Sequence, residues 1–78
     1  MSYINEIVSV NAFYFVGKSN KMFPRRIEWN DTQYNFQSGL QYLVKNGERA
    51  LRLFDMTDGV NTYRLRLENN QWTLVGTK

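Results

Sequence analysis

The feature that most constrains this chain is a two-residue alternation of apolar and polar side chains, repeatedly interrupted by turn-forming residues. Over residues 25–77 aromatic and aliphatic residues tend to occupy every second position, while asparagine, aspartate and glycine separate the runs. Such alternation is typical of strands that bury one face, and short polar interruptions are typical of hairpin turns. The pattern predicts an all-β fold, an antiparallel meander of six to eight strands.

Turn chemistry predicts which residues face each other, because a slip of one residue would send every side chain to the opposite face of the sheet. Turns are expected at residues 30–33, 37–39, 46–47, 57–59 and 69–70. These turns place Tyr34 opposite Tyr42, Leu53 opposite Tyr63, and Leu65 opposite Leu74. The inner face then consists of Ile27, Trp29, Tyr34, Phe36, Leu40, Tyr42, Val44, Leu51, Leu53, Tyr63, Leu65, Leu67, Trp72 and Leu74.

A sheet with one strongly apolar face must cover that face, either by curling or by taking a lid from the rest of the chain. Residues 1–78 are expected to form a single small domain in which the meander curls into a barrel or half-barrel. The chain has no cysteine and therefore no disulfide. Its stability must come from packing, to which twelve aromatic residues contribute.

The N-terminal segment is the only lid available to this sheet. Residues 8–17 are predicted to form one bent strand or a short hairpin, with Phe13 and Phe15 pointing inward. An alternative for residues 2–8 is a short helix that starts at Ser2.

The residue types exclude most catalytic and metal sites. With neither histidine nor cysteine, the chain has no nucleophile–histidine pair, no redox dithiol and no set of zinc ligands. Asp58 precedes a glycine and is interpreted as a turn residue, whereas Asp55 could cap turn amides or pair with Arg49. We therefore expect no enzymatic activity, no bound metal and no cofactor.

Hydropathy and charge set the expected location. No apolar run approaches the roughly 18 residues of a membrane-spanning helix, and the first ten residues contain no lysine or arginine. These features predict a cytoplasmic protein that does not enter membranes. The net charge of +3 permits an anionic partner without requiring one.

The predicted outer face carries the candidate functional residues. The expected registers place Arg52 directly opposite Arg64, with Arg66 next along the strand and the Phe54 ring nearby. Arginines grouped with an exposed aromatic ring suit single-stranded nucleic acid or another polyanion, such as an acidic protein. The predicted anion-binding site consists of Arg26, Arg52, Phe54, Arg64, Arg66, Lys18 and Lys21.

Two other interpretations use the same face. The arginines could simply keep the sheet solvated, with their stems packed along it and no ligand at all. The apolar members of this face could instead form a protein interface, such as that of a homodimer. That patch consists of Leu43, Ala50, Phe54 and Val75.

Overall fold

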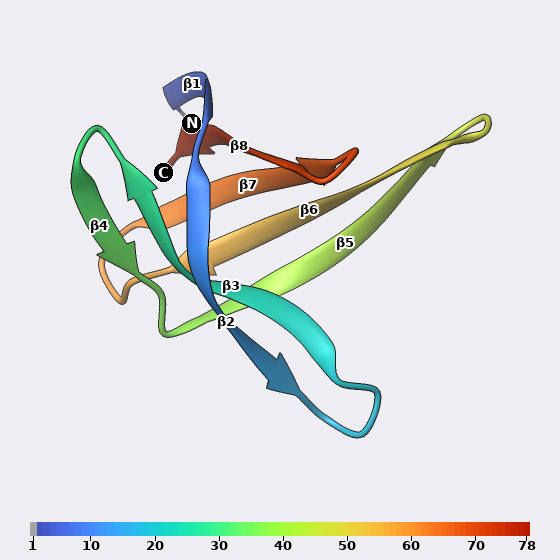
Figure 1. The fold of residues 1–78 in the computed structure, drawn as a ribbon, viewed down its shortest axis with the longest axis horizontal. Helices are drawn as coiled ribbons and strands as arrows, with labels where there is room; N and C mark the ends of the chain where they lie inside the picture. The colour runs from blue at the N-terminus through green and yellow to red at the C-terminus, as the bar shows by residue number, and fades with distance from the viewer. Residues whose placement is uncertain (1) are drawn as a thin grey trace.

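The structure, a computed structural model, describes residues 2–78 and consists over that range of eight β-strands (Figure 1). They are β1 (Ser2–Ile7), β2 (Ser9–Val16), β3 (Lys21–Trp29), β4 (Thr32–Asn35), β5 (Ser38–Asn46), β6 (Arg49–Thr57), β7 (Thr62–Glu68) and β8 (Gln71–Thr77). The predicted all-β class is confirmed. The alternative of an N-terminal helix is wrong, because its residues form β1.

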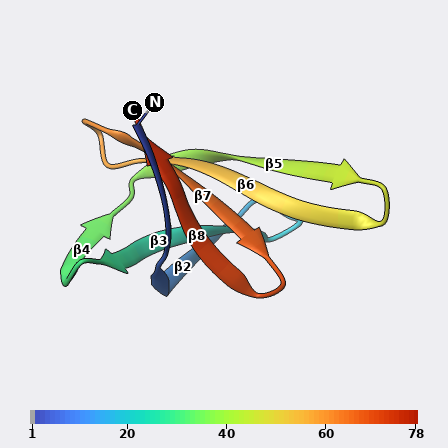
Figure 2. The same cartoon turned by 90° about the horizontal axis from the view of Figure 1, so that it is seen from above.

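The strands form two antiparallel sheets rather than one. A five-stranded sheet has the order β1-β8-β7-β6-β5, and a three-stranded sheet has the order β2-β3-β4. Figure 2 shows the smaller sheet on one side of the larger one, with the long β5–β6 and β7–β8 hairpins extending past it. Over residues 2–78 the two sheets do not close into a barrel, so of the predicted barrel or half-barrel the closed form is not found.

The chain changes sheets between Phe36 and Gln37. The backbone amide of Phe36 donates to the carbonyl oxygen of Arg25 in β3 of the small sheet, at 2.8 Å, whereas the amide of Gln37 donates to the carbonyl oxygen of Thr57 at the end of β6, also at 2.8 Å. The expected pairing of Tyr34 with Tyr42 is therefore wrong. Two adjacent amides bond to different sheets, so β4 cannot continue the meander into β5.

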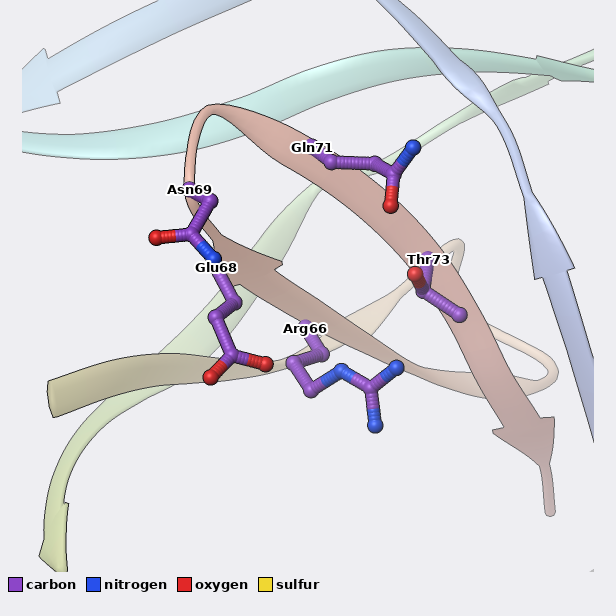
Figure 3. A pocket seen from close by; sticks show the side chains of 5 residues that line it. All are labelled: Arg66, Glu68, Asn69, Gln71 and Thr73. Carbon is purple, nitrogen blue, oxygen red and sulfur yellow. The ribbon is translucent and has the colours of Figure 1, made fainter. Parts of the chain in front are cut away.

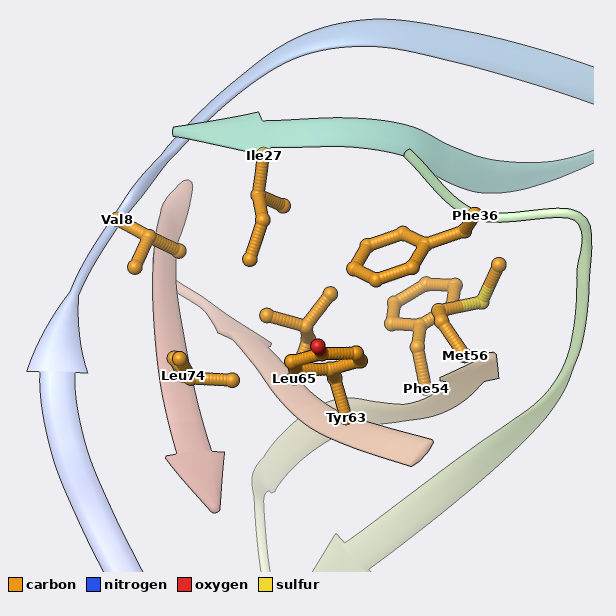
Figure 4. Packing of buried hydrophobic residues seen from close by; sticks show 8 residues of the cluster. All are labelled: Val8, Ile27, Phe36, Phe54, Met56, Tyr63, Leu65 and Leu74. Carbon is orange, nitrogen blue, oxygen red and sulfur yellow. The ribbon is translucent and has the colours of Figure 1, made fainter. Parts of the chain in front are cut away.

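The core lies between the two sheets and takes side chains from both. Ile27 and Phe36 reach down from the small sheet and its exit toward the strands of the large sheet (Figure 4). The buried apolar residues are Val8, Ile27, Phe36, Phe54, Met56, Tyr63, Leu65 and Leu74. Aromatic contacts link the layers, since the Phe54 ring lies 5.1 Å from the Trp72 ring and 6.2 Å from the Phe23 ring.

The β7–β8 hairpin follows the sequence prediction. Leu65 faces Leu74 and Leu67 faces Trp72, as the turn chemistry requires. Asn69 and Asn70 both adopt positive φ, 53° and 61°, which is the backbone that a two-residue hairpin turn needs. The inward direction of these apolar side chains is confirmed.

Two other hairpins are displaced from the expected register but keep their faces. Ile27 pairs with Tyr34, whereas the expected turn places it opposite Phe36. Tyr42 pairs with Leu53, whereas the expected turn places it opposite Leu51. The β5–β6 turn is centred on Gly47 and the next residue, with Gly47 at a φ of 65°. Because the side-chain period of a strand is two, a shift of two positions leaves facing residues on the same side.

The β6–β7 connection is longer than predicted. Thr57 pairs with Thr62, so four residues form the loop where three were expected. The Asp58 carboxylate accepts backbone hydrogen bonds from Val60, at 2.9 Å, and from Asn61, at 2.8 Å. A short polar side chain that accepts two amides in this way stabilises the wider turn.

This longer loop reverses the faces of β5 and β6. Leu53 now faces Arg66 instead of Tyr63, a shift of three positions, and an odd shift turns each side chain to the other side. Phe54 and Met56 therefore point into the core. The predicted inward positions on these two strands are wrong for Leu40, Tyr42, Val44, Leu51 and Leu53.

The N-terminal segment divides between the two sheets. β1 pairs with β8, and buried Val8 separates it from β2, which pairs with β3. The Phe13 ring contacts the Trp72 ring at 6.1 Å but stays 39% exposed, and Phe15 is 63% exposed. The predicted inward position of Phe15 is wrong, because the β2–β3 hairpin extends beyond the strands that it covers.

Candidate interaction face

The register places the three candidate arginines on opposite sides of the five-stranded sheet. Arg52 pairs with Leu67, whereas Arg64 pairs with Asp55. Buried Leu65 lies between Arg64 and Arg66 in β7, so both arginines point away from the core, while Arg52 shares the side of buried Phe54. The predicted pairing of Arg52 with Arg64 is wrong.

Arg64 forms an ion pair within the chain, so its charge is not free to bind an anion. Its Nε and Nη2 donate to the two carboxylate oxygens of Asp55 at 2.7 and 2.8 Å. These hydrogen bonds hold the pKa of Asp55 below its usual value, although partial burial acts in the opposite direction. The sequence had allowed an ion pair between Asp55 and Arg49, but Arg49 pairs with Glu68 instead.

Arg66 lines a shallow depression on the same outer face. This depression has a volume of about 190 Å³ and is otherwise lined by the polar side chains of Glu68, Asn69, Gln71 and Thr73 (Figure 3). Glu68 is already paired with Arg49, which approaches from β6. The depression contains no exposed aromatic ring, so it lacks the stacking surface that was predicted beside Arg66.

Phe54 lies outside any exposed site. Its side chain is fully buried and contacts rings from both sheets. A base could reach this ring only if the core opened. The Leu43, Ala50, Phe54 and Val75 patch also fails to form, because its central member is inside.

The remaining predicted basic residues belong to the small sheet. Lys18 lies in the β2–β3 turn, Lys21 begins β3, and Arg26 lies further along β3 opposite Asn35. The Arg26 Nε atom is buried and has no hydrogen-bond partner among the described residues. The structure therefore spreads the seven predicted site residues over two sheets and the core.

A different feature occupies the outer side of β5 and β6. We name it the β5–β6 apolar face, and it consists of Leu40, Tyr42, Val44, Leu51 and Leu53. Leu40 is 61% exposed, and Tyr42 and Val44 are each about two-fifths exposed. No other strand covers this side, because the small sheet packs against the opposite one.

Two ion pairs and one further arginine border the β5–β6 apolar face. The Arg64–Asp55 pair lies beside Leu40, since Asp55 faces both Leu40 and Arg64 in the register. The Arg49–Glu68 pair lies at the other end of the face. Arg66 faces Leu53 between them and takes part in neither pair.

Sequence reasoning missed this face because it expected a shorter β6–β7 loop. The useful signal was Asp58, whose carboxylate can accept amides two and three residues ahead and thus favours a four-residue loop. With that loop length, period-two alternation would have placed Phe54 inside and Leu53 outside.

The inner side of the same hairpins leaves a small groove uncovered. Leu43, Ala50, Arg52 and Leu67 line it, and its volume is about 290 Å³. Leu43 is 60% exposed. The groove lies where the β5–β6 and β7–β8 hairpins extend past the small sheet.

Over residues 2–78, no three side chains of the metal-ligating types come together. The same range contains no helix long and apolar enough to cross a membrane.

No protein-family model, curated protein or solved structure matches the chain. Its class is therefore defined by its own geometry, a small all-β domain of two stacked antiparallel sheets.

Proposed function

We propose that this chain is a non-enzymatic protein-interaction module that associates with a second copy of itself through the β5–β6 apolar face. The observation that carries the proposal is a row of apolar side chains, exposed at Leu40, Tyr42 and Val44 and half-buried at Leu51 and Leu53, on a side of the large sheet that no strand in residues 2–78 covers. Contiguous apolar surface of this kind, bordered by polar residues, is typical of protein interfaces.

The closed ion pairs favour a second copy over a strongly charged partner. Arg64 and Arg49 already have carboxylate partners within the chain, which leaves Arg66, opposite Leu53, as the bordering arginine outside these pairs. A second β5–β6 apolar face matches this chemistry, because its centre is apolar and most of its bordering charges are paired. A two-fold dimer in which both copies use the same patch meets this requirement.

Polyanion binding has less support. The predicted site needed Phe54 as a stacking ring, and that ring is fully buried. It also needed Arg52 beside Arg64, yet the two point to opposite sides of the sheet. The basic residues could still give weak, salt-sensitive attraction to nucleic acid, as scattered positive charge does.

Sedimentation over a concentration series tests the proposed self-association. We expect the wild-type mass to rise from monomer to dimer with concentration. Leu40→Lys and Tyr42→Lys should weaken the dimer at least tenfold, since each would bury a charge in an apolar contact. Val60→Lys is the matched control, because Val60 is 87% exposed but lies in the β6–β7 loop away from the face.

Thermal unfolding of the same variants shows whether each remains folded. Both test positions are exposed, so their substitution should leave the monomer intact. A wild-type protein that stays monomeric at every concentration contradicts the proposal. So does a dimer that tolerates Leu40→Lys and Tyr42→Lys as well as it tolerates Val60→Lys.

A further inference from the structure

β5 is the least protected edge strand of the fold. It is the last strand of the five-stranded sheet, paired with β6 on one side and with no strand on the other in residues 2–78. Its Gln41 side chain donates to the Met22 carbonyl oxygen of β3 at 2.7 Å, so the backbone of this edge and not the Gln41 amide is available to a second strand. It runs for nine residues, contains no proline and carries one charged side chain, Lys45. Long, uncharged edge strands present unpaired backbone groups to which another strand can add.

The three other outer strands each carry a feature that discourages pairing. β1 is broken by a register shift around Asn5, which has a φ of 54°. β2 has two register shifts against β3, and β4 is only four residues long. Bulges and short edges are the usual ways in which sheets avoid unwanted strand addition. β5 has neither.

The register of the β5–β6 hairpin shows which backbone groups are free. The two-residue turn makes Asn46 and Arg49 a hydrogen-bonded pair. Such pairs alternate along an antiparallel ladder, so Val44, Tyr42 and Leu40 also bond to β6. The intervening residues, Gln41, Leu43 and Lys45, direct their N–H and C=O groups to the open edge.

We propose that two copies join edge to edge through antiparallel pairing of β5 with β5, and so form one continuous ten-stranded sheet. This inference rests on the proposed self-association, but it places the contact at the β5 edge, beside the β5–β6 apolar face. Tyr42 is the midpoint of β5, so pairing about Tyr42 uses all nine residues of both strands. The two β5–β6 apolar faces then merge into one surface across the two-fold axis.

Pairing about Tyr42 is self-complementary. Leu40 faces Val44 of the second copy on the outer side, and Leu43 faces the second copy's Gln41 on the inner side. Lys45 faces the second copy's Gly39, so no like charges are opposed. Leu43, which is 60% exposed in the single chain, gains a neighbouring strand beside it.

Engineered cysteines test this register directly, because the chain contains none of its own. A mixture of Gln41→Cys and Leu43→Cys proteins, oxidised with copper–phenanthroline, should give a disulfide-linked heterodimer. Directly opposed residues of an antiparallel pair have Cα atoms within the roughly 4.4–6.8 Å that a disulfide spans. Each variant oxidised alone is the control, since neither position faces itself.

Proline substitution tests the backbone pairing independently. Leu43→Pro removes an N–H that points to the open edge and not one that bonds to β6, so the chain should fold while the dimer weakens at least tenfold. Leu43→Thr keeps the N–H and should dimerise like the wild type. The cysteine mixture does not depend on the proline variant's folding, so the proposal stays testable if that variant unfolds.

The outcomes separate this inference from the proposed function. Cross-linking of the mixture together with dimer loss in Leu43→Pro supports edge pairing. A dimer that Leu40→Lys disrupts, but that neither cross-links at residues 41 and 43 nor responds to Leu43→Pro, overturns edge pairing and leaves face-to-face association standing. A chain that never dimerises overturns both.

Discussion

Arg64 in β7 and Asp55 in β6 face each other, and the guanidinium donates two hydrogen bonds to the carboxylate, of 2.7 and 2.8 Å. The side chain of Asp55 is only 13% exposed and that of Arg64 is 31% exposed, so water screens the pair only in part. Two-point contacts of this geometry are the stronger class of protein ion pairs. The pair fixes the register of β6 against β7 on the outer side of the sheet.

Asp55→Asn should lower stability at neutral pH and change the response to acid. The pKa of Asp55 is held below its unfolded value by Arg64, so the pair stabilises the fold at pH values above about 3.9. That contribution is lost as the pH falls through the folded pKa. Thermal unfolding between neutral and strongly acidic pH should show a difference of about 1–3 kcal/mol between wild type and variant that shrinks in acid. Glu28→Gln, which removes a carboxylate outside both ion pairs, should not reproduce it.

Phe54→Ala should be among the most destabilising single changes in the chain. The side chain is fully buried between Phe23 and Trp72, so its removal leaves a cavity and should cost about 3–5 kcal/mol. Leu40→Ala, on the outer side of β5, should cost less than about 1 kcal/mol in the monomer. Urea unfolding at a concentration below dimer formation measures both. Equal losses would mean that β5 and β6 face the other way.

Gly39→Ala should destabilise the fold for a steric reason. A Cβ built on Gly39 would lie 2.3 Å from the Met56 Sδ and 2.7 Å from the backbone oxygen of Asp55. The backbone oxygen cannot move away as a flexible side chain can, so we expect a loss of about 1–3 kcal/mol. Gly47→Asn is the useful comparison, because Gly47 has open space around it and a positive φ that asparagine tolerates. A chemical denaturation series should rank Gly39→Ala well below Gly47→Asn.

Arg26→Met should be neutral or mildly stabilising. The Arg26 Nε is buried and has no hydrogen-bond partner within residues 2–78, and an unpaired buried donor opposes folding. Methionine keeps much of the length of the side chain and removes that donor. A melting temperature at or above that of wild type is the expected result. A large drop would show that the guanidinium has a stabilising role that the hydrogen bonds around it do not reveal.

Sequence alone was sufficient wherever turn chemistry and alternation agreed. The Asn69–Asn70 turn gave the correct β7–β8 register from the turn as far as Leu65 and Leu74, beyond which a bulge shifts the pairing by one residue at Arg64. The displaced β5–β6 turn left the predicted grouping of side chains unchanged, because a shift of two positions kept Tyr42 and Leu53 on the same side of the hairpin. These cases show that the faces of a hairpin depend on whether the register error is even or odd, more than on its size.

The predicted anion-binding site was wrong because the β6–β7 loop is longer than expected. Thr57 and Asp58 stabilise a four-residue loop through side-chain hydrogen bonds, and the resulting odd shift exchanged the two sides of β5 and β6. Alternation could not reveal this error, since both sides of these strands contain apolar residues, such as Leu53 and Phe54. The division into two sheets was also hidden, because it depends on long-range hydrogen bonds made by Phe36 and Gln37.

The pairing of the first strand with the last has a consequence for how the protein is made. Ser2 lies beside Thr77, and both ends of the chain meet at one side of the large sheet (Figure 1). During synthesis β1 has no partner strand in the large sheet until β8 has left the ribosome. Contacts of such large sequence separation form slowly. We therefore expect the β1–β8 pairing to form late in folding, after the hairpins between β5 and β8.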